Sequence, residues 1–286
     1  MLTTGVAYYK RQLWVYNLGV HDEVTNTGHM YMWGEHTASR GSQEIASCLL
    51  YHIRNCLPPT TKEVILYSDS CGGQNRNIKM TLMLSYIVQK TEIQEIQQKV
   101  FLPGHSFSTC DQDFGIFERD KKYHPYIFQT DDWCTVVEKV KEKQPKFVVH
   151  KMTSDLFFSS KSLEVNITNG KVNDKNDKVE WLKIRSLKVQ REHPKLLFYT
   201  YNCLEDDVFC ALDIAKKSRR GRHIRLFPDT LEPLYPEGRK ISKDKVKDLK
   251  NLLKFEPPQL HQFYMSLHGE EEGIPAQSNS DEDSVA

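Results

Sequence analysis

The chain has 286 residues, of which 39% are hydrophobic and 27% charged, a composition typical of folded globular proteins rather than of disordered or fibrous chains. Its seven cysteines are odd in number and lack CxxC spacing, which argues against a disulfide framework or a zinc site and favours a reducing compartment, cytoplasmic or nuclear. The sequence shows neither a secretory signal nor an apolar run of the roughly 18 residues that cross a bilayer, so we expect no membrane partner.

The first half of the chain alternates strand and helix patterns. The turn residues Asn26-Thr27-Gly28 separate two strand-forming runs and predict a hairpin. Ser42 is a candidate N-cap for an amphipathic helix that Pro58-Pro59 ends. The resulting order is β-β-α-β-α-β-α, with elements expected at residues 13–19, 29–33, 42–57, 64–67, 78–88, 99–102 and from about 111.

The second half predicts a small basic β-rich module. Ser242 is expected to cap a short basic helix that runs to Leu253, and an acidic tail from residue 268 is expected to be disordered. We therefore expect a core at 1–138, the module with its helix at 139–267 and the tail at 268–286. The strand-like runs of the module lie at residues 147–150, 163–167, 181–189, 196–201 and 209–214.

Charge is distributed unevenly along the chain. Residues 139–255 hold 27 Lys and Arg against 16 Asp and Glu, a net of +11, and the rest of the chain holds 12 against 22, a net of −10. Such polarity favours a polyanion partner for the basic part, DNA above all. The densest cluster, at 216–225, indicates either a nucleic-acid contact or a solvated surface run. Its candidate contacts are Lys216, Lys217, Arg219, Arg220 and Arg222.

Three motifs together resemble a known group of proteins. They are Ser-Asp-Ser-Cys-Gly-Gly-Gln-Asn-Arg-Asn at 68–77, Pro-Gly-His-Ser at 103–106 and Asp-Gln-Asp-Phe-Gly at 111–115. As a set they are similar to an uncharacterised family of transposon-derived proteins with an integrase-like core. The resemblance implies a ribonuclease-H-like mixed sheet with flanking helices, and recombinases of this kind usually act as multimers, so a homo-oligomer is among the expectations.

The resemblance also implies a chemistry. Two Mg²⁺ or Mn²⁺ ions held by carboxylates would activate a nucleophile and stabilise the leaving oxygen of a phosphodiester. Asp69 and Asp111 would be metal ligands, with Glu118 as the third catalytic carboxylate and Asp113 in reserve. Related chains carry an earlier strand with an acidic residue, which we expect this chain to lack. Asp22 and Glu35 are candidate substitutes for that residue. Gln74, Asn75 and Arg76 would contact the nucleic acid.

Each candidate also has a structural interpretation. Asp69 is suited to close its strand through an Asx-type turn, and Glu118 and Asp113 could belong to the solvated face of a helix. His105 is more often a hydrogen-bonded core residue than a ligand.

Three functional hypotheses follow. The preferred one is a transposon-derived protein that binds DNA and has lost cleavage, and the second is an active metal-dependent nuclease or transposase. The third, from another class, is a cysteine hydrolase with Cys71 as nucleophile and His105 and Asp111 as base and orienting group. A nucleophile elbow leads directly into a helix, whereas Gly-Gly-Gln-Asn-Arg-Asn follows Cys71.

Overall fold

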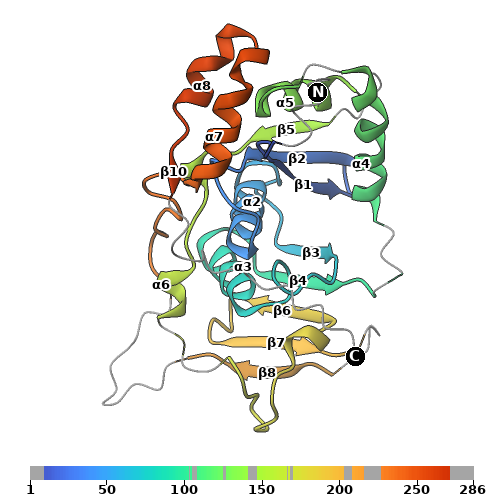
Figure 1. Cartoon of the computed structure of the whole chain (residues 1–286). Coiled ribbons are helices and arrows are strands. Elements are labelled where there is room, and N and C mark those ends of the chain that lie inside the picture. Colours follow the sequence, from blue (N-terminus) through green and yellow to red (C-terminus); the bar gives the residue numbers. More distant parts are fainter. Residues whose placement is uncertain are drawn as a thin grey trace. The chain divides into compact units, whose positions relative to one another are not determined.

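The computed structural model of the chain describes residues 10–102, 104, 108–124, 127–140, 147–165, 167, 170–202, 208–215 and 227–270. The chain divides into two compact units, each of which combines helices with strands (Figure 1), so the expected α/β class is confirmed. We call residues 1–39, 107–154 and 235–286 the hairpin unit, and residues 40–106 and 155–234 the five-strand unit.

The hairpin unit contains a three-stranded sheet in the order β1-β2-β5. Strands β1 (Val15–Asp22) and β2 (Thr27–Gly34) pair antiparallel, as the sequence predicts. Asn26 adopts a φ of 51°, the left-handed conformation that asparagine tolerates in a tight turn. Strand β5 (Val148–Lys151) then pairs parallel with β2.

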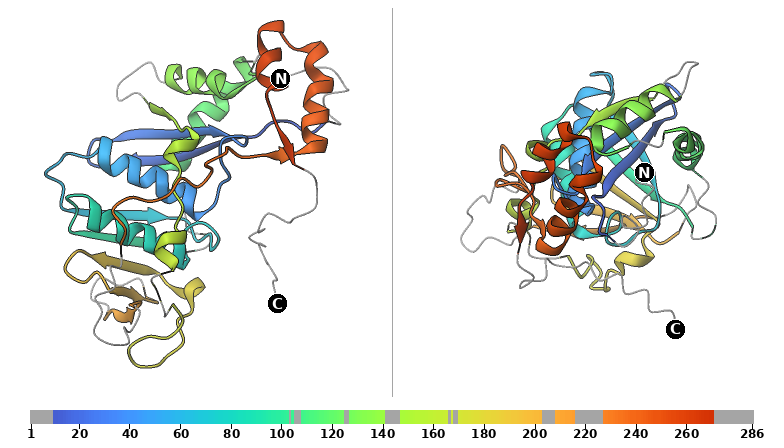
Figure 2. Two further views of the ribbon diagram at one scale, coloured as in Figure 1. Left: turned by 90° about the vertical axis from the view of Figure 1, so that its left-hand side faces the viewer. Right: turned by 45° about the horizontal axis from the view of Figure 1, so that its top comes forward.

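Two helices of the hairpin unit pack on this sheet (Figure 2): α4 (Thr109–Asp120) and α5 (Thr130–Lys139). Met32 of β2, Phe117 of α4 and Val137 of α5 share one buried cluster. Each fully buried side chain of this size contributes about 1.5–3 kcal/mol to folding. This cluster fixes α4, the helix that carries three of the candidate carboxylates.

The C-terminal part of the hairpin unit forms its own small core. Val246, Leu249 and Tyr264 are buried there together with Ile241 and Leu267. The apolar side of the basic helix is therefore occupied by packing within the unit. The elements are β9 (Ile241–Ser242), α7 (Lys243–Leu252), a 3₁₀ turn at Leu253–Phe255, a second at Pro258–Leu260, α8 (His261–Met265) and β10 (Gly269–Glu270).

The five-strand unit has the sheet order β3-β4-β6-β7-β8. Strands β3 and β4 are parallel, and each later strand pairs antiparallel with its neighbour. Helix α3 packs on β4 and β6, and α2 packs beside α3 (Figure 1). The elements are α2 (Ser42–Asn55), β3 (Glu63–Ser68), α3 (Ile78–Lys90), β4 (Glu95–Val100), α6 (Lys161–Glu164), β6 (Ser186–Gln190), β7 (Leu196–Thr200) and β8 (Cys210–Asp213).

The order of the first seven expected elements is confirmed, but the expected boundary at residue 138 is wrong. Strands β6, β7 and β8 continue the sheet begun by β3 and β4, while β5 joins the hairpin, so the described strands of the second half belong to the same sheets as those of the first half. The apolar run at 163–167 begins within the short helix α6 instead of forming a strand. Gly41, one residue before the predicted cap, is the N-cap of α2.

Among the described residues, no helix is both long and apolar enough to cross a membrane.

Candidate functional site

Asp69 lies exposed directly after β3, where the sequence predicts it. Its Oδ1 accepts a hydrogen bond from the Cys71 backbone N–H at 3.2 Å and another from Asn75 Nδ2 at 2.5 Å. The first bond is the Asx-type turn of the structural interpretation, and the second ties the carboxylate across the following loop. Asp69 therefore stabilises the loop that follows β3.

The expected nucleic-acid donors of this loop also bond within the chain. Gln74 Nε2 donates to the Arg40 carbonyl at 3.2 Å, and Arg76 Nε donates to the Ser70 carbonyl at 3.0 Å. A second Arg76 nitrogen donates to the Leu182 carbonyl. Together with Asn75, these side chains hold the loop in shape through hydrogen bonds to residues of the same unit.

Asn77 closes the loop and begins α3. Its Oδ1 accepts from the Met80 N–H at 2.9 Å, and its Nδ2 donates to the Gly72 carbonyl at 2.9 Å. Helix α3 thus starts at Ile78, seven residues after Cys71. A cysteine at this distance from the helix is not the nucleophile of a strand-to-helix elbow, so the loop geometry offers the cysteine-hydrolase hypothesis no support.

Asp111 belongs to the hairpin unit, whereas Asp69 belongs to the five-strand unit. Asp111 is the third residue of α4, and its Oδ2 accepts from the Ser108 N–H at 3.1 Å and from the Ser108 hydroxyl at 2.9 Å. Ser108 Oγ accepts in turn from the Asp111 N–H. This reciprocal pair is a capping box, which stabilises the start of a helix.

Asp113 is buried, with 3% of its surface exposed. Its Oδ2 lies 2.6 Å from His21 Nδ1, and His21 Nε2 lies 3.1 Å from Asn26 Oδ1. The space is tight, because a Cβ on Gly28 would come within 2.7 Å of the same carboxylate oxygen. His21 and Asp113 therefore pin α4 to the hairpin. The sequence did not predict this pair, since a lone histidine in a strand carries no local signal for its partner.

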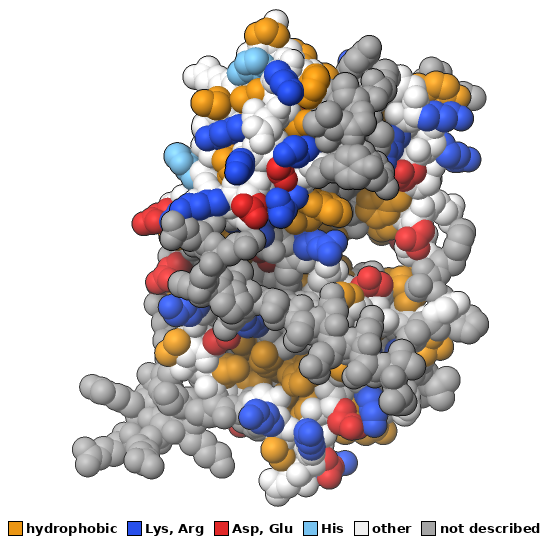
Figure 3. Space-filling model, in the orientation of Figure 1, with side chains coloured by type: hydrophobic (Ala, Val, Ile, Leu, Met, Phe, Trp, Pro, Cys, Tyr) orange, Lys and Arg blue, Asp and Glu red, His pale blue; other side chains and the backbone are white. Residues whose placement is uncertain are grey.

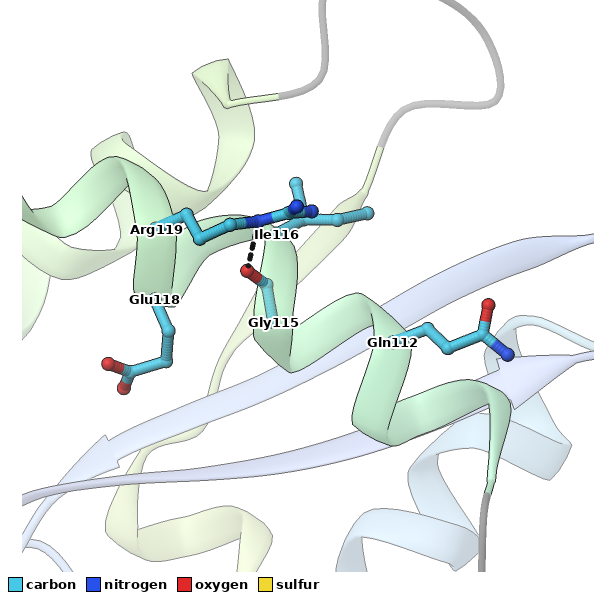
Figure 4. A pocket seen from close by; sticks show the side chains of 5 residues that line it. All are labelled: Gln112, Gly115, Ile116, Glu118 and Arg119. Carbon is cyan, nitrogen blue, oxygen red and sulfur yellow. Dashed lines mark hydrogen bonds between the residues drawn. The ribbon is translucent and has the colours of Figure 1, made fainter.

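Glu118 is exposed and lies 3.8 Å from Lys121 Nζ. It borders an open depression of about 650 Å³ on α4 (Figure 4). Figure 4 shows Glu118 and Gln112 pointing in different directions, and Arg119 Nε donating to the Gly115 carbonyl. Since all of the lining residues come from one helix, the depression does not gather polar groups around a substrate. The lining residues are Gln112, Gly115, Ile116, Glu118 and Arg119.

The two candidate substitutes for the missing carboxylate are engaged elsewhere in the hairpin unit. Asp22 accepts from the Val24 N–H at 2.9 Å and from the Thr25 hydroxyl at 2.9 Å, so it shapes the hairpin turn. Glu35 is buried and forms an ion pair with Lys245 Nζ at 2.6 Å.

The charged residues of α7 and of the 3₁₀ turn that follows it differ in whether they have an ion-pair partner. Asp248 accepts from Lys10 Nζ at 2.8 Å and from Arg11 Nη1 at 3.0 Å, and its bond to Lys10 lowers the pKa of Asp248 to about 2. Three other residues, Lys247, Lys250 and Lys254, are exposed and have no carboxylate within ion-pair distance among the described residues. We call these three the lysine stripe.

Two predicted groups lie outside the described residues. They are His105 and the basic cluster, with Lys216, Lys217, Arg219, Arg220 and Arg222. Comparisons of the chain with protein-family models, with curated proteins and with solved structures found no match.

Proposed function

We propose that this chain is a nucleic-acid-binding protein of transposon origin, built on a ribonuclease-H-like core, that does not cleave phosphodiesters. Three lines of reasoning support it: the motif resemblance, the hydrogen bonds of the carboxylates and the arrangement of charge. The observation that carries the proposal is the lysine stripe, because it is a positive surface that no carboxylate neutralises among the described residues.

The stripe has the dimensions of a phosphate-contact surface. Taking 100° and 1.5 Å per residue in α7, and about 120° and 2.0 Å per residue in the 3₁₀ turn that carries Lys254, the three lysines fall within an arc of about 80° and over about 11 Å of helix axis. A DNA strand carries one phosphate per ~3.4 Å of duplex axis, so the stripe spans roughly three phosphates. Figure 3 shows Lys and Arg side chains gathered over the C-terminal helices.

The acidic residues of α7 do not interrupt this surface. Asp244 lies 3.5 Å from Arg11 Nη2, and Asp248 is paired with Lys10 and Arg11. The apolar face of α7 is buried against Tyr264 and its neighbours, and the exposed large apolar side chains of the adjoining segments are Phe255 and Met265, which do not make up the continuous apolar face of a membrane-bound helix. Nucleic acid is therefore favoured over a membrane as the polyanion.

The carboxylates support the loss of cleavage. A two-metal site needs several carboxylate oxygens converging on ions about 3.5–4 Å apart. The four candidate carboxylates are each engaged by the residues around them instead: Asp69 and Asp111 are tied into a turn and a cap, Asp113 is held by His21, and Glu118 lies beside Lys121.

The binding claim is tested by fluorescence anisotropy with a labelled DNA duplex. We expect the triple variant K247Q/K250Q/K254Q to bind more weakly and to lower the slope of log K against log salt by about 2 to 3, at roughly 0.9 per lost phosphate contact. The matched control, K161Q/K175Q/K178Q, removes three exposed lysines of the five-strand unit and should change binding much less. If both triple variants lose the same amount of DNA affinity, the stripe contributes only through the net charge of the protein and is not a specific contact surface.

The cleavage claim is tested by a nicking assay on supercoiled DNA with Mg²⁺ or Mn²⁺. We expect no nicking by the wild-type chain. Nicking that disappears in both Asp69→Asn and Asp111→Asn would replace the proposal with the active nuclease.

A further inference from the structure

The edge strand β3 of the five-stranded sheet exposes two large side chains on one face. In β3, Val64, Leu66 and Ser68 are partly buried, whereas Ile65 is 55% exposed and Tyr67 is 60% exposed. Parallel strands are usually covered on both faces. An exposed tyrosine and isoleucine two residues apart on such a strand mark a surface suited to binding.

Tyr67 is held in place by an aromatic neighbour. Its ring and that of Phe101 stack with centroids 5.9 Å apart and an interplanar angle of 23°. The Phe101 N–H donates to the Ser68 carbonyl at 2.9 Å, which fixes the backbone beside Tyr67. The exposed part of the tyrosine ring is thus ordered before any ligand arrives, and this lowers the entropic cost of stacking on it.

The ammonium group of Lys99 lies near the Tyr67 ring. Lys99 lies opposite Tyr67 in the β3–β4 pairing, and its Nζ is 5.8 Å from the centre of the tyrosine ring. Further along the same face, Lys188 is 3.4 Å from Glu95. Lys99, in contrast, has no carboxylate at ion-pair distance among the described residues, so its charge remains available.

Two arginines, Arg185 and Arg76, also belong to this end of the sheet, beside the exposed Asp69. Arg185 has a buried guanidinium nitrogen, Nη1, that no hydrogen-bond acceptor reaches in the described part of the chain. Its carbonyl accepts from the Val100 N–H at 2.8 Å, next to Phe101. Burial and the nearby charge of Arg185 lower the pKa of Arg76. This end of the sheet therefore favours an anionic ligand.

We infer that Tyr67, Phe101 and Lys99 form a stacking site for an unpaired base of a single-stranded nucleic acid. The base lies on the exposed face of Tyr67, and the adjoining phosphate contacts the Lys99 ammonium. Every base presents a π-face, so such a site is tolerant of sequence. Bases within a duplex are stacked on one another and cannot reach Tyr67, which makes the site selective for single strands. The inference rests on the proposed function and adds a ligand class to it.

The test compares a labelled oligothymidylate with a duplex of equal length. We expect Tyr67→Ala to weaken single-strand binding about 5- to 100-fold, the order of one lost base stack, and to leave duplex binding unchanged. Tyr67→Phe keeps the ring and should restore binding. The matched control is Tyr123→Ala, because Tyr123 is also exposed, at 69%, with a lysine 4.9 Å from its ring centre.

A second readout reports stacking itself. An oligonucleotide with one 2-aminopurine should lose fluorescence on binding the wild type and Tyr67→Phe, but not on binding Tyr67→Ala. Unchanged single-strand affinity and unchanged quenching in a folded Tyr67→Ala protein would overturn the inference, and so would duplex binding by a wild type that ignores single strands. If the wild type binds neither DNA, the proposed function itself fails.

Discussion

At the residue scale, three of the four carboxylates that the resemblance singled out have a structural task. Asp69 closes a turn, Asp111 caps a helix and Asp113 is held by a histidine. The sequence predicted the positions of Asp69 and Asp111 at the end of a strand and the start of a helix. It could not predict the His21 partner of Asp113, because that contact joins residues 92 positions apart.

The His21–Asp113 pair should be important for stability. Both side chains are 4% exposed, and breaking a buried pair by removing one partner costs up to about 3–5 kcal/mol. We expect His21→Ala to lower the free energy of unfolding by this order, as measured by urea denaturation. The control Glu118→Gln, on the exposed side of the same helix, should stay within about 0.5 kcal/mol. A small effect of His21→Ala would show that the pair is not a structural anchor.

At the scale of elements, an aromatic contact joins β2 to β5. The rings of Tyr31 and His150 stack at 4.6 Å, and His29 Nδ1 lies 3.1 Å from His150 Nε2. Burial, together with the neighbouring His29, lowers the pKa of His150 to about 4. The folded chain therefore favours the neutral imidazole.

This contact predicts a pH dependence. An unfolded histidine has a pKa near 6.5, so between about pH 6.5 and pH 4 the unfolded chain binds more protons than the folded one. The stabilisation is complete above pH 6.5 and is lost as pH falls toward 4. Urea midpoints measured from pH 7.5 to 4.5 should decline, and the decline should be smaller in His150→Phe. Identical pH profiles for the two proteins would contradict the assignment.

The loop between β3 and α3 depends on its cap. Replacing Asn77 with Ala removes the side-chain bond to the Met80 N–H and the bonds to the carbonyls of Gly72 and Gly73. Loss of an N-cap costs about 1 kcal/mol, and we expect at least this loss in urea denaturation. Asn77→Asp keeps the acceptor and should recover part of it. If both variants have the same free energy of unfolding as the wild type, the hydrogen bonds of Asn77 do not stabilise the loop.

The elements also show where sequence patterns stop being informative. The strands and helices of residues 15–120 follow local periodicity and turn residues, and they were predicted in the right order. The pairing of β4 with β6 joins residues about ninety positions apart, and no local pattern encodes it. The exposure of Tyr67 could not be predicted either, since the sequence of β3 gives no sign of which face of the strand stays open to solvent.

At the scale of the whole molecule, the proposal depends on charge. Residues 139–255 carry a net +11 and the remainder a net −10, and the lysine stripe lies within the basic part. Nucleic-acid binding through such a surface releases counterions, so affinity must fall steeply as salt rises.

The salt dependence of DNA binding by the full chain is the most direct test of this account. Titrations of single-stranded and duplex DNA between 50 and 200 mM KCl, roughly the range over which phosphate contacts are weakened, should give linear plots of log K against log salt with a negative slope of at least about 3. A flat plot, or no binding at the lowest salt by a folded protein, would contradict the proposal that this chain binds nucleic acid.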